Sequence, residues 1–499
     1  MRKRSLLAGS AVAVLVCMCT ATAATATQVV IDPLVSLGAG SVPRSIAVGP
    51  NGEFYTANYG AGTVTGFNAS GASLNNATIS LGGGAAPRAI ARDSFGALWI
   101  ADAGTASVSR YVPGEPSAST YSLGGTRAPG AVAVDHSSTA SADTVYAADS
   151  VGNSIWEVTQ SGGLISPISQ FATLAAGALP KGIVTDSMGN VYTANSGTST
   201  VSKITPGGVV TDKFAEFSPG DGPDAITIDS HGILYVANYV AGTVAKVDST
   251  KPAGANVVGT FTLAPDAHPL GITVDMHDNV YVSNSGPNTV SMIPAGSNSS
   301  PLTILTLPNN AGASGIVVSS TNTLLVTGFG NNTVTSLDLS TSITTTSLTS
   351  ATVGKAFTQT ITATGVDPIT FASTDLPSWL TLSADGTLSG TPTADGAYSF
   401  SVTATGPTGS SISKNYTIEV AAVNTGGGTG GTGAPAGGTG AGSGNGAGTG
   451  GSGATATLAH TGTSGPTLAG FAGTAAAIMA IGLALTSFRR RLSLQRNSR

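Results

Sequence analysis

Cysteine and charged side chains are scarce in this sequence of 499 residues. The only cysteines, Cys17 and Cys19, lie in the first 26 residues, which we expect to be removed, so the mature chain should have neither disulfides nor thiol chemistry. Charged residues make up 9% of the chain and aromatic residues 5%. The 68 glycines, together with many alanines, threonines and serines, disfavour long soluble helices. This composition favours short strands joined by tight turns.

Basic residues are few between the two ends of the chain. Eight of the 20 lysines and arginines lie in the terminal segments, whereas none of the 25 acidic residues does. The remaining 12 basic residues leave the part between these segments with a net charge of −13. Binding to nucleic acid requires a basic surface, so we expect no nucleic-acid partner.

The first 26 residues have the features of a secretory signal peptide. A basic cluster, Arg2 to Arg4, precedes an apolar stretch from Leu6 to Met18, and small residues follow. The apolar stretch is too short to span a membrane comfortably. We therefore assign residues 1–26 to a signal peptide and expect an exported protein.

The C-terminal segment, residues 458–499, combines three ordered elements. An uncharged stretch over residues 468–488 is long enough to cross a bilayer, and a cluster of arginines follows it directly. The pentapeptide before it consists of Leu458, Ala459, His460, Thr461 and Gly462. This order resembles a sortase sorting signal of the LAxTG type. The resemblance implies that a sortase cleaves after Thr461 and joins it covalently to peptidoglycan. A single-pass membrane anchor with the domains outside is the alternative.

Residues 422–457 consist almost entirely of Gly, Thr, Ala and Ser. Such a segment cannot bury a core and behaves as a flexible coil. About thirty residues of this kind have a root-mean-square reach of roughly 30 Å. We therefore expect a disordered tether between the folded domains and the anchor.

Seven copies of one unit fill residues 28–340. Six begin at a proline and the seventh near Ala313, at intervals of 42 to 51 residues, the length of a four-stranded propeller blade. In five copies, the distance from the proline to an Asn or Asp that ends the second strand is the same. The prolines are Pro43, Pro87, Pro129, Pro180, Pro223 and Pro269.

These units resemble NHL repeats and the virginiamycin B lyase-like and gluconolactonase-like propellers. The resemblance implies an all-β fold with a seven-bladed β-propeller over residues 28–340. The seventh copy lacks its fourth strand before the next domain begins. We expect the segment from Val29 to Gly38 to supply that strand and to close the ring without a free edge.

Residues 342–421 have a different character, with alternating Thr-rich strands. The stretch from Leu376 to Leu382, followed by Asp385-Gly386 and Gly390-Thr391-Pro392, resembles the cadherin-like, dystroglycan-type Ig domain of bacterial surface proteins. The resemblance implies a small Ig-like β-sandwich. We expect Trp379 to be a large buried anchor of its core.

Candidate ligand contacts lie where the propeller loops converge on one end of the channel. The residue after the opening proline is basic in blades one, two and four, and the Asn or Asp that ends each second strand lies beside it. This set could bind a glycan or a small anion. Alternatively, the basic residues pair with acids, and the Asn and Asp side chains cap turns. The candidate ligand-binding face comprises Arg44, Arg88, Lys181, Asn58, Asn195, Asn238 and Asn284.

Catalytic residue types are scarce at this end. The lyase-like and lactonase-like relatives use His and acidic residues with a metal, but here His136, His231 and His277 fall in turns at the opposite end and only His268 lies at the mouth. The chain has only five glutamates, so an acid–base pair is hard to assemble. We expect no catalytic residues, metal or cofactor. The predicted function is a surface binding or display module for a glycan, protein or small molecule, with a propeller enzyme as the alternative.

Overall fold

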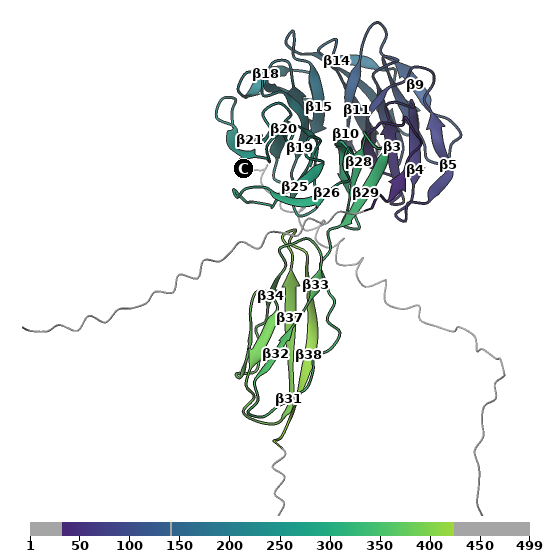
Figure 1. Cartoon of the computed structure of the whole chain (residues 1–499). Helices are drawn as coiled ribbons and strands as arrows, with labels where there is room; N and C mark the ends of the chain where they lie inside the picture. The colour runs from purple at the N-terminus through teal and green to yellow at the C-terminus, as the bar shows by residue number, and fades with distance from the viewer. Residues whose placement is uncertain (1–31, 140–141, 424–499) are drawn as a thin grey trace, which may run out of the picture. The chain divides into compact units, whose positions relative to one another are not determined.

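The computed structural model describes residues 32–139 and 142–423, and every regular element in these ranges is a β-strand (Figure 1). The prediction of an all-β fold is therefore confirmed. Within these ranges, no helix is long and apolar enough to cross a membrane. The signal peptide, the span predicted at 468–488 and nearly all of the predicted tether lie outside the described residues.

Seven sheets form the blades of the propeller, and in five of them four consecutive strands of one repeat pair in chain order. The strands of blades one, two and four are β2 (Pro43–Val48), β3 (Phe54–Asn58), β4 (Thr63–Phe67), β5 (Ser73–Ser80), β6 (Pro87–Arg92), β7 (Leu98–Asp102), β8 (Ser107–Tyr111), β9 (Ser119–Ser122), β15 (Pro180–Thr185), β16 (Val191–Asn195), β17 (Thr200–Ile204) and β18 (Val210–Glu216). Those of blades five and six are β19 (Pro223–Ile228), β20 (Ile233–Asn238), β21 (Thr243–Asp248), β22 (Val257–Thr262), β23 (Pro269–Val274), β24 (Val280–Asn284), β25 (Thr289–Ile293) and β26 (Leu302–Thr306).

Blade three is the longest because its repeat carries an insertion. Its sheet has five strands, and a short additional strand pairs with the end of the third. The strands are β10 (Pro129–Thr139), β11 (Ala142–Asp149), β12 (Ser154–Ser161), β13 (Leu164–Ile165) and β14 (Ser169–Thr173). The insertion therefore lengthens the blade without interrupting the ring.

The first strand of each repeat lines the channel. These seven strands contact one another in the cyclic order β2, β6, β10, β15, β19, β23 and β27 (Ala313–Val318), and β27 returns to β2. Blades seven and one approach closely at Gly315, where a Cβ atom would lie 2.6 Å from Cα of Ser45. Glycine is required at this position because any side chain would push the two strands apart.

Blade seven is completed by the N-terminal segment. Its own strands are β27, β28 (Thr323–Gly328) and β29 (Thr333–Asp338), and β1 (Val35–Ser36) pairs antiparallel with β29. The backbone N–H of Leu37 also donates to the carbonyl oxygen of Asn332 at 2.8 Å. The prediction that the N-terminal segment closes the ring is thus confirmed for its described part.

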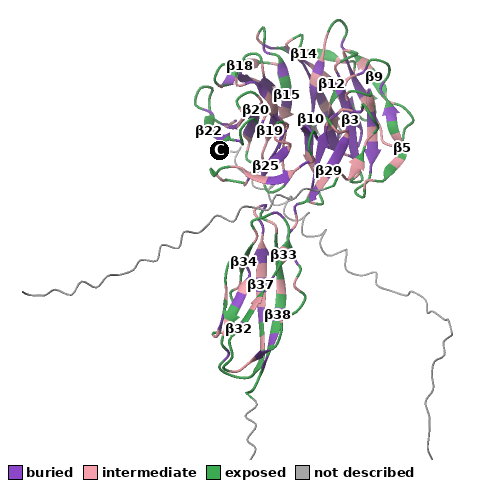
Figure 2. Ribbon diagram, viewed as in Figure 1, coloured by how far each residue is buried: buried purple, intermediate pink, exposed green. Residues whose placement is uncertain are grey.

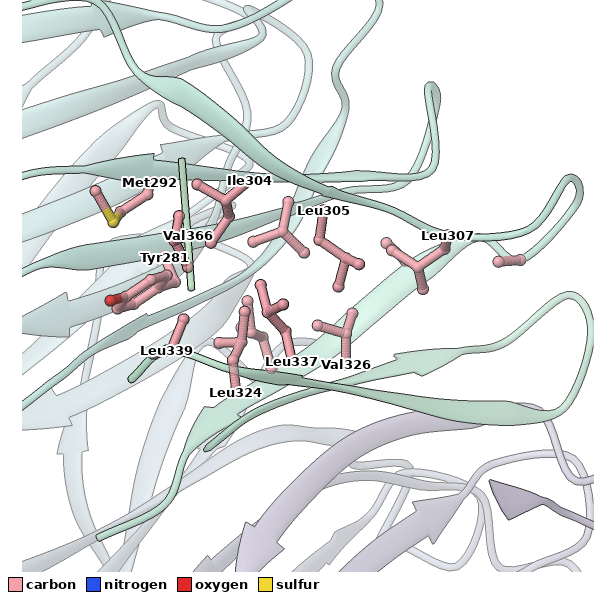
Figure 3. Close-up of a cluster of buried hydrophobic side chains, with 14 residues drawn as sticks. Tyr281, Met292, Ile304, Leu305, Leu307, Leu324, Val326, Leu337, Leu339 and Val366 are labelled. Atoms are coloured by element: carbon pink, nitrogen blue, oxygen red, sulfur yellow. The ribbon is translucent and has the colours of Figure 1, made fainter. Parts of the chain in front are cut away.

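Apolar side chains fill the space between adjacent blades. Figure 2 shows buried residues along inner strands such as β3, and exposed residues in the loops and along outer strands such as β5. Between blades six and seven, Leu305 of β26 lies opposite Leu324 of β28 and Leu337 of β29 (Figure 3). The propeller therefore has a series of cores between its blades rather than one central core.

Residues 342–421 form the predicted β-sandwich, whose sheets have the strand orders β31-β38-β37-β34 and β32-β36-β35, with β30 paired to β33. Its core contains Phe357, Leu388, Phe400 and Ile418. The strands are β30 (Ser342–Ile343), β31 (Ala351–Thr352), β32 (Phe357–Thr360), β33 (Ala363–Thr364), β34 (Thr370–Ala372), β35 (Leu380–Leu382), β36 (Thr387–Gly390), β37 (Gly396–Thr405) and β38 (Ser411–Ala421).

Trp379 is not the fully buried anchor expected from the sequence. It precedes β35 in a loop and is only half-buried, packing at the edge of the core. Its ring makes T-shaped contacts with Phe357 at 6.2 Å and with Tyr398 at 5.7 Å between ring centroids. The centre of the core is occupied instead by side chains of the paired strands, including Leu388 and Phe400.

Candidate functional site

A cavity of about 700 Å³ lies at the end of the channel where the first strands of the seven repeats begin, and we call it the mouth cavity. Each repeat contributes residues that follow its opening proline, or Ala313 in blade seven. The volume falls in the range of about 300–1,000 Å³ that is usual for small-molecule sites. The repeat therefore places seven equivalent positions around one pocket.

Arg44 of β2 and Arg88 of β6 hold the same position in adjacent blades, and both line the mouth cavity. Their Cζ atoms lie 5.7 Å and 5.3 Å from the centre of the Tyr59 ring. Cζ of Arg44 also lies 4.4 Å from the centre of the Phe329 ring. Among the described residues, neither arginine forms an ion pair with a carboxylate.

The two guanidinium groups are close enough to affect each other. Burial lowers the pKa of Arg44 below its usual value, and the positive charge of Arg88 lowers it further. Two like charges beside a partly desolvated surface repel each other. An anion bound between them would relieve this repulsion.

Lys181 of β15 also lines the mouth cavity, but its charge is compensated. Its Nζ lies 2.7 Å from Oδ1 of Asp224 in β19. Arg44, Arg88 and Lys181 therefore line the same cavity, and of these three only Lys181 is paired with an acid among the described residues. A net positive charge remains on the side of blades one and two.

Aromatic and hydroxyl groups of the cavity wall were missed from the sequence. Tyr59, Tyr239, Phe329, Ser150 and Ser285 line the mouth cavity, and each comes directly after the last residue of a second strand. The last residue of that strand is buried within the blade, and the chain then turns toward the channel. Four of these five residues directly follow the repeated Asn or Asp, and Phe329 follows Gly328, so this position in the repeat could have indicated them.

Three of the four serines that line the mouth cavity donate their hydroxyl hydrogens to backbone carbonyl groups. Oγ of Ser150, Ser285 and Ser314 donates to the carbonyl oxygens of Ala128 at 3.1 Å, His268 at 2.9 Å and Arg44 at 3.0 Å. With its hydrogen engaged in this way, a hydroxyl still has acceptor capacity. The cavity therefore presents cationic donors on one side and neutral acceptors elsewhere on its wall.

The four candidate asparagines are buried within their blades and do not line the mouth cavity. Each is buried, and its Nδ2 donates to a Thr hydroxyl of the next strand in its own blade. The structure thus corrects their expected place on the ligand-binding face, and they link the second and third strands instead. They are Asn58, Asn195, Asn238 and Asn284.

Replacing Asn195 by Ala is expected to destabilise the propeller without changing ligand binding. Asn195 accepts from Thr193 at 2.9 Å and donates to Thr200 at 3.2 Å and Ser202 at 2.8 Å, all in blade four. Loss of these buried bonds should lower the free energy of unfolding by about 2–3 kcal/mol. Urea denaturation measures the loss. A changed affinity for a ligand of the mouth cavity, with stability unaltered, would contradict the structural role.

Blades two and three carry an Asp in place of the Asn that ends the second strand, and the two Asp residues have different partners. Asp149 accepts from the guanidinium of Arg127 at 3.2 Å and from the backbone N–H of Ala128 at 2.9 Å. Asp102 has no cationic partner among the described residues, and burial raises its pKa to about 7, while a hydrogen bond from Ser109 acts in the opposite direction. Neither residue lines the mouth cavity.

No histidine is among the described residues that line the mouth cavity. His268 lines a smaller neighbouring pocket, and its ring stacks on Tyr239 with 5.0 Å between ring centroids. His136 and His231 lie beside Asp143 and Asp278, at distances of 3.1 Å and 3.0 Å. The described part of the chain holds no group of three or more His, Cys, Asp or Glu residues that could bind a metal. The sorting signal from Leu458 to Gly462 lies outside the described residues.

Solved structures with this propeller fold include streptogramin B lyase, at a TM-score of 0.54 and 14% identity over 61% of this chain and 95% of that one. Virginiamycin B lyase from Staphylococcus aureus matches at a TM-score of 0.53 and 17% identity, over 60% of this chain and 96% of that one. The catalytically inactive His-to-Ala variant of this lyase, with quinupristin, matches at a TM-score of 0.52 and 18% identity, with the same coverage. At these identities the similarity is one of fold.

Comparison with protein families covers both domains. No curated protein matches the sequence. The model described as "Putative Ig domain" matches residues 339–421, in agreement with the β-sandwich. The model of the virginiamycin B lyase family matches residues 72–365, more than half of the chain. The protein is therefore a member of the virginiamycin B lyase family, with an additional Ig-like domain.

Proposed function

We propose that this protein is an exported surface protein whose propeller binds a ligand in the mouth cavity without converting it. The observation that carries the proposal is the pair Arg44 and Arg88, which line a cavity of about 700 Å³ and have no carboxylate partner among the described residues. A structural ion pair would hold each cation against an acid, as in the case of Lys181. Charges left uncompensated at a pocket are typical of a binding site.

The chemical groups at the cavity favour binding over catalysis. Asp224 is the only carboxylate among the described cavity residues, and Lys181 holds it at 2.7 Å. A general base would need a free carboxylate or imidazole within reach of the reacting proton. The related S. aureus lyase is described as inactive when one histidine is replaced by alanine. No histidine of the described residues lines the cavity here.

The test is a binding and turnover screen with the chain that begins after residue 26. We would measure thermal shifts with neutral sugars, sugar acids, amino acids and quinupristin, and follow each hit by mass spectrometry. The proposal expects at least one hit that is recovered chemically unchanged. Conversion of quinupristin or of any hit into a new product would favour the alternative, a propeller lyase or lactonase.

We also propose that the protein is joined to peptidoglycan by a sortase through Thr461, on the strength of its LAHTG sequence, apolar segment and arginine cluster. Thr461→Ala removes the threonine side chain from the sorting signal, so the sortase should no longer cleave there. We expect the unaltered protein to be released from the wall only by muralytic digestion. The Thr461→Ala variant should instead be fully extractable with detergent. Fractionation and immunoblotting of the two strains measure this change. If the unaltered protein is already extracted by detergent alone, it is held by a membrane span instead.

A further inference from the structure

The mouth cavity distributes its polar groups unevenly. Arg44 and Arg88 lie in adjacent blades one and two, while the compensated pair of Lys181 and Asp224 belongs to blades four and five. An anionic group is therefore favoured at one side of the cavity only. Guanidinium groups bind oxyanions through paired hydrogen bonds, so a carboxylate or a sulfate fits this side.

The rest of the wall is suited to a ring that carries hydroxyl groups. Ser150, Ser285 and Ser314 donate to backbone carbonyls and so present acceptors to a ligand. The rings of Tyr59 and Tyr239 are half-buried and lie at the cavity, where they can pack against the C–H groups of a ring. Hydroxyl donors and C–H faces on one molecule, together with an oxyanion, are the features of an acidic sugar.

We propose that the mouth cavity binds a sugar unit bearing an oxyanion, with the anion between Arg44 and Arg88 and the sugar hydroxyls facing the serines. This inference rests on the proposed binding function and specifies its ligand class. The bound oxyanion would take the place of a carboxylate partner, which neither arginine has among the described residues. A uronic acid or a sulfated sugar of a polysaccharide supplies this chemistry.

The experiment compares charged sugars with matched neutral ones. NMR titrations of the chain that begins after residue 26 would use galacturonic acid, its methyl ester, galactose 6-sulfate, galactose and potassium sulfate. The methyl ester lacks the negative charge of galacturonic acid and carries one additional methyl group. We expect one of the two charged sugars to bind at least about tenfold more tightly than its neutral counterpart, and the better one identifies the oxyanion.

Three variants connect the binding to the arginine pair. Arg44→Gln/Arg88→Gln should weaken binding of the charged sugar by at least about tenfold, and Arg88→Gln alone by at least about threefold. Arg88 is exposed, so its single variant should fold even if the double variant does not. Arg92→Gln is the matched control because Arg92 ends the same strand, β6, away from the cavity. It should leave the affinity unchanged.

The outcomes separate this inference from the binding function. Equal binding of galacturonic acid and its methyl ester, and of both galactose compounds, would overturn the acidic-sugar assignment while leaving a neutral ligand of the cavity in place. Binding of potassium sulfate as tightly as the sugars would overturn the role of the ring. If none of these probes binds, the assignment is wrong, whereas the binding function would still be decided by the wider screen.

Discussion

Removing residues 29–38 is expected to lower the free energy of unfolding by about 3–5 kcal/mol. Leu34, Val35 and Leu37 pack against the cluster between blades seven and one, and β1 pairs with β29. Half-burial of three apolar side chains contributes about 1 kcal/mol each, and the lost backbone pairing adds to this. Urea denaturation of chains that begin at residue 29 and at residue 39 measures the difference.

A matched variant separates packing from strand pairing. Leu34→Ala/Leu37→Ala keeps the backbone of β1 and should retain a monomeric protein with an intermediate loss of stability. The full deletion should also expose the edge of β29 and promote association, which light scattering detects. An unchanged urea midpoint after the deletion would show that the ring does not depend on β1.

Asp102→Asn is expected to stabilise the propeller at pH 8 by about 3 kcal/mol. Burial raises the pKa of Asp102 from 3.8 to about 7, so the folded state favours the protonated acid. The raised pKa therefore lowers the free energy of unfolding at high pH. This loss is absent below pH 4, grows as the pH rises from 4 to 7, and reaches its full size above pH 7. Asn avoids the charge and can donate to Ser107 and Ser109, as Asn58 does to Thr63 and Thr65. Unfolding measured at pH 4 and pH 8 should show the gain only at pH 8.

The equivalent substitution in blade three, Asp149→Asn, should lower the stability of the propeller instead of raising it. Asp149 is paired with Arg127, and it also accepts from the backbone N–H groups of Ala128 and Val151. Asp149→Asn removes the charge that these donors stabilise and should lower stability at pH 8 by about 1–2 kcal/mol. If both variants changed stability in the same direction at every pH, burial of an unpaired charge would not be the cause at Asp102.

Most of the fold could be predicted because the repeat is regular. In five of the six copies that begin with a proline, the distance from the proline to the Asn or Asp of the second strand is the same. This distance, as from Pro43 to Asn58, reports the length of a hairpin that recurs around the ring. The short N-terminal strand could be predicted because the seventh repeat lacked one. Trp379 was placed wrongly because its size suggested burial, whereas its position in a loop before β35 leaves it at the edge of the core.

The candidate site could be predicted only in part. The equivalence of Arg44, Arg88 and Lys181 follows from the repeat, since the residue after each proline starts the strand that lines the channel. The repeat does not show which acids, if any, these three basic residues contact. Lys181 contacts Asp224 because the two blades are adjacent. No spacing in the sequence shows that, within the described residues, Arg44 and Arg88 form no ion pair with an acid. The depth at which Asn58 and its equivalents are buried also required the structure.

Titration of two tryptophan variants tests the binding claim most directly. Leu270→Trp places a large ring in the mouth cavity, and Met276→Trp places the same ring just beyond the other end of β23, where Met276 is 80% exposed. Isothermal titration with the best hit of the screen should show binding to the parent and to Met276→Trp, and at least about a tenfold loss for Leu270→Trp. Equal affinity of all three proteins would mean that the ligand binds elsewhere, and the mouth cavity would not be the functional site.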